Sequence, residues 1–137
     1  MEFDRNKTLE QLEESYSEKT NFNSYLVNNI SALRKKPLAE FGIEDLRIMI
    51  NQGIGLNYLI PIAVERLQEN LFAEGDYYPG DLLNTVLKVK EDYWKKNRNL
   101  WVEVKQLYNK NYPEIENDNL YKQIRINFQE FERITAN

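Results

Sequence analysis

Residues 57–70 of this chain read NYLIPIAVERLQEN, and this stretch decides the fold class. Its apolar residues, Leu59, Ile60, Ala63, Val64 and Leu67, recur at steps of one, three and four, so that they cover much of the circumference of a helix. A helix that is apolar on several sides is normally central to the core. We therefore predict a core helix over residues 57–70, with Pro61 in or near its first turn, where a missing backbone N–H costs little.

The same periodicity and the capping residues predict the other helices. Thr8 and Gln11 fit a capping box in front of a short first helix. The remaining helices are predicted over residues 21–36, over residues 42–53, in three short segments within residues 81–111, and over residues 120–134. No segment alternates with the period of two that a strand requires. The sequence thus predicts an all-α fold, with one compact domain of about seven or eight helices over residues 1–137.

The apolar stripes of these helices predict which side chains are buried. A large apolar side chain that is fully buried costs roughly 2–5 kcal/mol of stability when it is cut back to alanine. The predicted core consists of Leu26, Ile30, Leu46, Met49, Ile60, Val64, Leu67, Leu83, Leu87, Trp101, Val104 and Phe128.

The chain contains neither histidine nor cysteine among its 137 residues. This composition excludes Cys/His zinc sites, a Ser-His-Asp triad and a cysteine nucleophile. General acid–base chemistry would have to use Asp, Glu, Lys or Tyr alone. We therefore predict that the protein is not an enzyme, with no catalytic residues, no metal, no cofactor and no small-molecule substrate.

The sequence also carries no signal for a membrane or for secretion. Its longest apolar run, residues 59–64, is far shorter than the roughly 18 residues that a membrane span needs. Its first residues lack the basic and apolar segments of a secretory signal. Without cysteine it cannot form disulfides. We predict a cytoplasmic protein that does not bind a membrane.

Charge is distributed unevenly along the chain, whose net charge is −4. Residues 38–87 contain eight acidic and two basic side chains, which gives −6, whereas residues 88–111 contain seven basic and three acidic side chains, which gives +4. An acidic central stretch favours a basic partner and disfavours nucleic acid. A solvated surface with an uneven charge pattern would be the simpler explanation.

Three motifs with possible chemistry are weak. The carboxylates of Glu74, Asp76 and Asp81 do not follow the ligand spacing of a calcium loop. Lysines interleave with Tyr93, Trp94 and Trp101, as on a nucleic-acid surface, but these rings share helix faces with the predicted core, so burial is the better interpretation. No glycine lies in a phosphate-binding loop, because no Gly-Lys-Ser/Thr follows. We predict no nucleic-acid partner.

The segment DYYPGD, residues 76–81, has the most unusual local composition. Acidic residues beside two tyrosines suit a contact with a cationic protein surface, because tyrosine offers a large contact area and a polar end. In the alternative interpretation, which we favour for at least one of the two residues, Tyr77 or Tyr78 is tucked under the loop and Pro79-Gly80 is an ordinary turn. Asp81 is predicted to cap the next helix. The predicted binding surface is Glu69, Glu74, Asp76, Tyr77, Tyr78 and Asp81, with a second candidate patch at Glu40, Glu44 and Asp45.

Several strings together resemble one family. They are TLEQLE (8–13), FNSYLV (22–27), LRKKPL (33–38), EDLR (44–47), QGIGL (52–56), YLIP (58–61) and AEGDYYPGDLL (73–83). In combination they are similar to the immunity proteins of bacterial contact-dependent growth inhibition (CDI) systems. The resemblance extends from about Thr8 to Trp101, and the chain from about Glu103 onward is not typical of it.

The resemblance implies self-protection. An immunity protein of this kind binds and blocks the C-terminal toxin domain of a large surface protein delivered by a neighbouring cell, and many such toxins are nucleases. It therefore implies a cognate toxin domain as partner, bound one-to-one, and supplies no catalytic residues. Two alternatives remain, namely a generic α-helical protein-binding adaptor without a toxin partner and an enzyme that works with carboxylates and Tyr or Lys.

Overall fold

Helix α4, Leu56–Glu69, lies in the middle of the molecule and is buried along most of its length. The structure is a computed structural model and describes residues 2–16 and 25–134. The predicted core helix is thus confirmed. Pro61 is the sixth residue of α4, so it lies in the second turn, next to the first turn that was predicted to contain or adjoin it. Its ring therefore removes the N–H that would otherwise donate to the carbonyl of Asn57.

The all-α prediction is confirmed, since the described residues contain nine α-helices, two 3₁₀ turns and no strand beyond an isolated bridge. The first elements are α1 (Leu9–Glu13), α2 (Tyr25–Arg34), η1 (Leu38–Glu40), α3 (Ile43–Asn51) and α4. Then follow α5 (Asp81–Leu87), α6 (Glu91–Lys96), α7 (Arg98–Lys110), α8 (Tyr112–Ile115), η2 (Asn119–Tyr121) and α9 (Lys122–Arg133). Residues 81–111 form three helices, as predicted. The single-turn helix α8 was not predicted.

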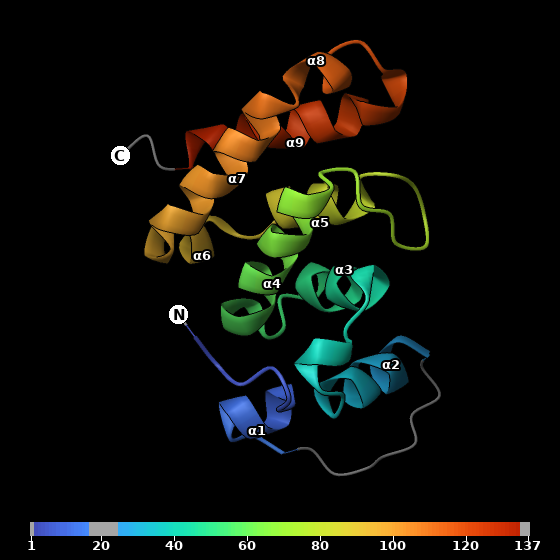
Figure 1. Cartoon of the computed structure of the whole chain (residues 1–137), viewed down its shortest axis with the longest axis vertical. Coiled ribbons are helices and arrows are strands. Elements are labelled where there is room, and N and C mark those ends of the chain that lie inside the picture. The colour runs from blue at the N-terminus through green and yellow to red at the C-terminus, as the bar shows by residue number, and fades with distance from the viewer. Residues whose placement is uncertain (1, 17–24, 135–137) are drawn as a thin grey trace.

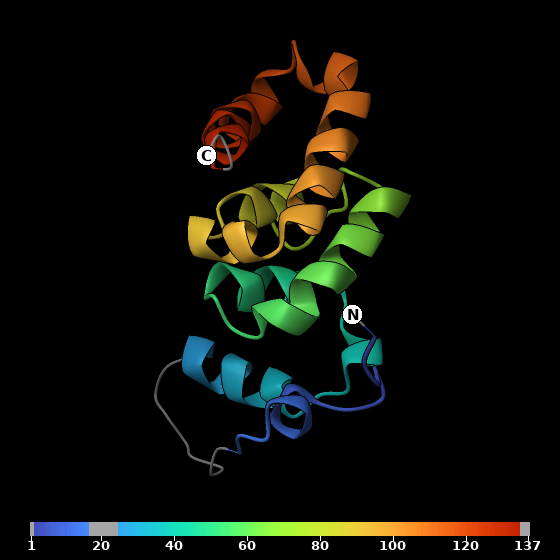
Figure 2. The same cartoon turned by 90° about the vertical axis from the view of Figure 1, so that its left-hand side faces the viewer.

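The helices are stacked along the long axis of the molecule in the order of the chain (Figure 1). Helices α1 and α2 lie at one end, α3, α4 and α5 in the middle, and α7 to α9 at the other end. The view from the side shows α7 and α9 as the two arms of a hairpin that closes this end (Figure 2). One cluster of buried apolar side chains runs from Leu9 in α1 to Phe131 in α9 and joins these parts.

The helix ends follow the predicted capping rules. The N–H of Gln11 donates to the Thr8 hydroxyl at 3.2 Å and the N–H of Thr8 donates to the Gln11 side chain at 2.9 Å, so that the capping box is complete. At the end of α3, Gly53 has φ +71°, and the N–H of Ile54 donates to the carbonyl of Met49 at 3.0 Å. These are the features of a glycine-terminated helix.

Helices α3 and α5 lie side by side and run in the same direction. At their N-terminal ends, the carboxylates of Glu44 and Asp81 converge on Gly75, where an added Cβ would lie 2.5 Å and 3.0 Å from their oxygens. At their C-terminal ends, Gln52 and Lys88 line one hollow. The pair therefore has one end at which both N-termini meet and one end at which both C-termini meet.

The predicted core is confirmed except in α2. Ten of its twelve side chains are buried, from Leu46 in α3 to Phe128 in α9, and Ile30 is half-buried. Leu26 is 42% exposed, so its predicted burial is wrong. It lies one turn before Ile30 on the same face, where the described residues leave it uncovered. Phe22, which belongs to the same stripe, lies outside the described residues.

The C-terminal helices form an aromatic part of the core. Trp101 donates its indole N–H to the carbonyl of Phe131 at 3.0 Å. The rings of Tyr108 and Phe128 are stacked with their centroids 3.6 Å apart. These contacts join α7 to α9, so the region outside the resemblance found in the sequence is well packed.

Candidate functional site

The loop of residues 70–80 joins α4 to α5 and is closed at its base by backbone hydrogen bonds. The N–H of Gly80 donates to the carbonyl of Phe72 at 3.1 Å. Nearer the tip, Glu74 and Pro79 pair as an isolated antiparallel bridge. The residues between these two form the tip of the loop. The loop stands out at the edge of the molecule beside α5 in Figure 1.

Asp81 supports this loop from beneath. It is only 2% exposed, and its carboxylate accepts hydrogen bonds from the N–H groups of Gly75, at 2.7 Å, and Tyr77, at 3.1 Å. The prediction that Asp81 caps α5 is wrong, because the N-cap is Gly80 and Asp81 is the first helical residue. From that position its side chain reaches back to the loop. Its negative charge is also favourable at a helix N-terminus.

Glu44, from the second candidate patch, contacts the same loop. Its carboxylate accepts a hydrogen bond from the N–H of Asp76 at 2.9 Å. It also receives two hydrogen bonds from the Arg47 guanidinium, at 2.7 and 2.6 Å. These Arg47 bonds are the main reason that the pKa of Glu44 lies below its ordinary value; burial opposes the shift, and the Asp76 bond and the charge of Arg47 add to it. The structure thus brings parts of the two predicted patches together.

The two tyrosines of the loop have different environments. Tyr77 is 68% exposed, and the guanidinium carbon of Arg47 lies 4.5 Å from the centre of its ring, which is a cation–π contact. Tyr78 is half-buried, and its hydroxyl accepts a hydrogen bond from the Asn84 amide at 2.8 Å. The prediction that one tyrosine is tucked under the loop is therefore confirmed for Tyr78, whereas Tyr77 is presented to solvent.

The C-terminal region holds the loop from the other side. The Asn127 amide of α9 donates a hydrogen bond to Asn84, which in turn donates to Tyr78. The rings of Phe72 and Tyr121 are stacked with centroids 4.8 Å apart. A short chain of polar contacts and one ring pair therefore connect the loop with η2 and α9.

Sequence reasoning did not find these supporting residues. Asn84 lies in α5, all seven residues of which are buried, and a polar side chain in such a helix needs a hydrogen-bond partner. That requirement was the available signal. The sequence could not name Asn127 as the partner, because the two residues are 43 positions apart.

The carboxylates of the remaining predicted residues are not bonded to the loop, although Glu69 directly precedes it in the chain. Asp45 belongs to α3, but its carboxylate accepts hydrogen bonds from the N–H of Gly42 at 3.0 Å and from Lys36 at 2.8 Å. Glu40 and Glu69 are exposed, and within the part of the chain that the structure describes no hydrogen bond or ion pair joins either of them to the loop. Six of the nine predicted residues therefore lie together at the loop, and Glu40, Asp45 and Glu69 are not part of this group. The six are Glu44, Glu74, Asp76, Tyr77, Tyr78 and Asp81.

We call Glu44, Glu74, Asp76 and Tyr77 the loop surface. Its members are the side chains of the two patches that lie at the loop, apart from the buried Asp81 and the half-buried Tyr78, whose hydroxyl is bonded to Asn84. Three of them are acidic, and Arg47 compensates part of that charge through Glu44. Three consecutive N–H groups, those of residues 75–77, donate to carboxylates from two helices. The arrangement can present an exposed ring and two free carboxylates on a backbone that is already ordered.

Other kinds of site receive little support from the described residues. The rings of Tyr93, Trp94 and Trp101 are buried, as predicted, so they do not offer faces on which bases could stack. Within residues 2–16 and 25–134, no three acidic side chains are grouped closely enough to hold a metal ion. In the same ranges no helix has the length and apolar character needed to cross a bilayer.

Comparison with known proteins gives one match. The profile of a family described as CDI immunity proteins matches residues 10–104. No curated protein matches the chain, and no solved structure does so either. The matched range includes the loop, both helices whose carboxylates hold it, and Asn84. It ends before Tyr121 and Asn127, which support the loop from the C-terminal region.

Proposed function

Since this chain belongs to the family of CDI immunity proteins, we propose that it neutralises one cognate toxin domain by binding it one-to-one and occluding it. The partner would be the C-terminal toxin domain of a large surface protein, and the encounter would take place in the cytosol. The whole chain of 137 residues would act as one domain without catalytic activity. We assign the contact with the toxin to the loop surface.

The observation that carries this assignment is the order built into the loop. The carboxylates of Asp81 and Glu44 hold three consecutive backbone N–H groups, while the side chains at the tip remain exposed. Binding normally costs free energy for ordering side chains and loops at the interface. A loop that is ordered before binding avoids part of this cost, and interfaces concentrate their binding energy in a few residues such as tyrosine.

The charge of the loop surface indicates the chemistry of the partner. Glu74 and Asp76 are exposed acids, and neither forms an ion pair through its side chain with another described residue. A basic surface on the toxin would complement them. We propose a nuclease as the toxin, because an enzyme that binds phosphate backbones needs a positive active site. Carboxylates at the rim of such an interface would mainly accelerate association.

Charge reversal tests this proposal. The double variant Glu74→Lys with Asp76→Lys should lose roughly tenfold or more in affinity for the toxin domain, because like charges then oppose each other. Its affinity should also fall less steeply with added salt, since the screened attraction is gone. Isothermal titration calorimetry at two salt concentrations measures both effects, and growth of cells that co-express the toxin measures protection.

A matched control separates position from net charge. Glu114→Lys with Glu116→Lys changes the net charge equally at two exposed residues in and next to α8, far along the chain from the loop. It should bind and protect like the unchanged protein. If the loop variant also keeps full affinity and protection, the loop surface is not the toxin contact. If the unchanged protein does not bind its cognate toxin domain, the proposal of toxin neutralisation is wrong.

A further inference from the structure

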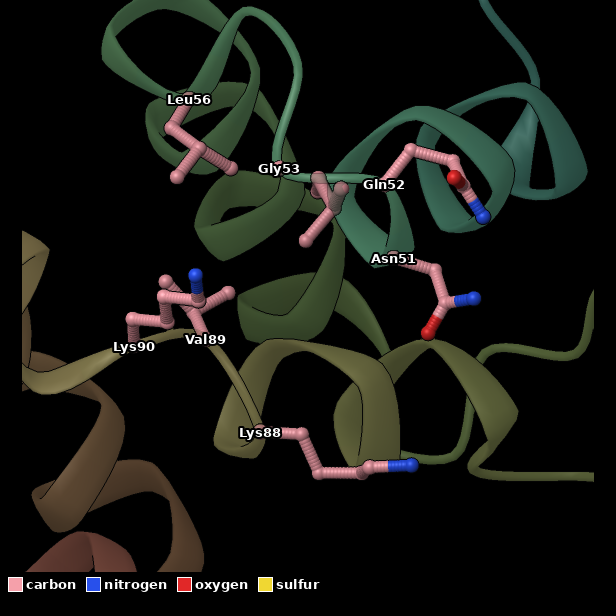
Figure 3. A pocket seen from close by; sticks show the side chains of 8 residues that line it. Asn51, Gln52, Gly53, Leu56, Lys88, Val89 and Lys90 are labelled. Atoms are coloured by element: carbon pink, nitrogen blue, oxygen red, sulfur yellow. The ribbon is translucent and has the colours of Figure 1, made fainter.

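A hollow lies at the opposite end of the α3–α5 pair from the loop surface. It has a volume of about 330 Å³, and its lining includes Asn51, Gln52, Leu56, Lys88, Val89 and Lys90. Figure 3 shows Leu56 and Val89 on opposite sides of its apolar part, with Asn51 and Gln52 along another edge. Its volume is at the lower end of the roughly 300–1,000 Å³ that ligand sites occupy.

The charged groups around this hollow have one sign. Its lining includes two lysines and no acidic side chain. Lys88 and Lys90 are both exposed, and within the described ranges of the chain neither is paired with a carboxylate. Lys88 is the C-cap of α5, where its charge is favourable at the helix C-terminus, and Lys90 is the N-cap of α6. They therefore remain available to an anionic group from outside.

The other lining groups favour a polypeptide as the occupant. The side-chain amides of Asn51 and Gln52 each offer donors and an acceptor, which match the N–H and C=O groups of an extended backbone. The side chains of Leu56 and Val89 provide an apolar surface for one side chain of the ligand. A nucleic acid would instead require exposed aromatic rings or a longer row of cations, and the lining contains neither.

We propose that this hollow binds an extended segment of a partner protein in which an acidic side chain stands beside an apolar one. The carboxylate would pair with Lys88 or Lys90, and the apolar side chain would contact Leu56 and Val89. This surface is separate from the loop surface, because the two lie at opposite ends of α3 and α5. The proposal therefore does not depend on the toxin assignment.

A titration of the full chain with a defined peptide tests the proposal. The probe is the five-residue peptide Ala-Asp-Ala-Leu-Ala, blocked at both ends, in which the aspartate and the leucine share one face of the extended chain; it is added to the ¹⁵N-labelled protein and followed by NMR. The backbone signals of residues 50–53 and 88–90 should shift together and saturate. The same peptide with lysine in place of aspartate should bind at least about tenfold more weakly.

Two double variants make the test specific. Lys88→Glu with Lys90→Glu should weaken the aspartate peptide about tenfold and strengthen the lysine peptide. Lys110→Glu with Lys122→Glu changes the net charge equally at two exposed lysines elsewhere and should leave both peptides unchanged. Equal binding of the two peptides, or equal binding by the first variant, would overturn the proposal. Tighter binding of an oligothymidine to the same residues would also overturn it, in favour of nucleic acid.

Discussion

The two ends of the α3–α5 pair use their charged side chains in opposite ways. At the N-terminal end, the acids Glu44 and Asp81 accept hydrogen bonds from the backbone of the loop. At the C-terminal end, the bases Lys88 and Lys90 stand at the edge of a hollow without an ionic partner among the described residues. The positions of Glu44, Asp81 and Lys88 suit the dipoles of α3 and α5, which favour acids at N-termini and bases at C-termini, whereas Lys90 is the N-cap of α6.

This difference shows two roles for charged side chains. Some hold the backbone of a site in its conformation, and others offer their charge directly to a partner. Asp81 and Glu44 give the loop its shape, and the side chains that they leave exposed are Glu74, Asp76 and Tyr77. The lysines shape nothing comparable. Changes to the charged side chains at the acidic end should therefore affect folding as well as binding, whereas changes to the lysines at the basic end should affect binding far more than stability.

The largest effect on stability is expected for Asp81→Ala. The change leaves the N–H groups of Gly75 and Tyr77 without their acceptor, and it should cost about 3 kcal/mol of unfolding free energy. Urea unfolding measures this cost, and hydrogen exchange should become faster at both amides. Asp76→Ala, which removes an exposed carboxylate, should cost less than about 0.5 kcal/mol. Equal stabilities of the two variants would show that Asp81 does not hold the loop.

Two glycines at the two ends provide the next comparison. Gly80 has φ +92°, and an added Cβ would lie 2.9 Å from the end of the buried Ile124 side chain. Gly53 has φ +71°, but its added Cβ would meet nothing within 4 Å. Gly53→Ala should cost about 1 kcal/mol for the left-handed backbone alone. Gly80→Ala should cost about 2 kcal/mol, because packing against α9 is disturbed as well.

Thermal unfolding of both variants checks this difference. Combining Gly80→Ala with Ile124→Val should recover part of the loss, since the shorter side chain leaves room for the new methyl group. A Gly80→Ala protein that is no less stable than Gly53→Ala would argue against close support of the loop by the C-terminal helix.

A smaller effect is expected from the protonation of Glu44. Its folded-state pKa lies below its ordinary value of 4.5, mainly because of the Arg47 hydrogen bonds. Its contribution to stability should therefore be present above about pH 4.5 and should be lost as the pH falls through the lowered pKa. The NMR shift of the Asp76 amide should follow the same titration. In Arg47→Met the midpoint should move upward, and an unchanged midpoint would contradict this assignment.

The smallest effect on stability is expected at the basic end. Lys88→Gln removes one favourable charge from the C-terminus of α5 and should cost only about 0.5 kcal/mol. Added salt should reduce even this difference, because the side chain is exposed. Urea unfolding at low and high salt measures both values. A cost as large as that of Asp81→Ala would mean that Lys88 has a structural partner and that the two ends are alike.

Local patterns predicted most of the fold. Helix periodicity and the caps at Thr8 and Gly53 depend on neighbours in the chain, so the elements were accessible from sequence. The burial of Leu26 was predicted wrongly for a tertiary reason. An apolar stripe shows which face of a helix packs against the core, but it does not show how far along the helix the packing partner extends. Likewise, Asp81 was predicted to be the N-cap of α5. Because the turn ends at Gly80, Gly80 is the N-cap, and Asp81 is the first helical residue, from which its carboxylate binds the loop.

The candidate surface was predictable only in its composition. Acids beside two tyrosines indicated a binding loop, but the sequence could not distinguish the tucked Tyr78 from the exposed Tyr77. It placed Glu44 in a separate patch, because the hydrogen bond to Asp76 spans 32 residues. The support from Asn127 was missed for the same reason. Contacts between distant residues are set by packing and not by any local pattern.

The central claim is that the toxin contacts the loop surface, and site-specific photocrosslinking tests it most directly. A photoreactive phenylalanine derivative would replace Tyr77 in one protein and Tyr16 in another, since the two tyrosines are almost equally exposed, at 68% and 69%. Each protein is mixed with the cognate toxin domain and irradiated. We expect a covalent one-to-one adduct from position 77 and none from position 16. An adduct from position 16 alone would contradict the assignment of the loop surface.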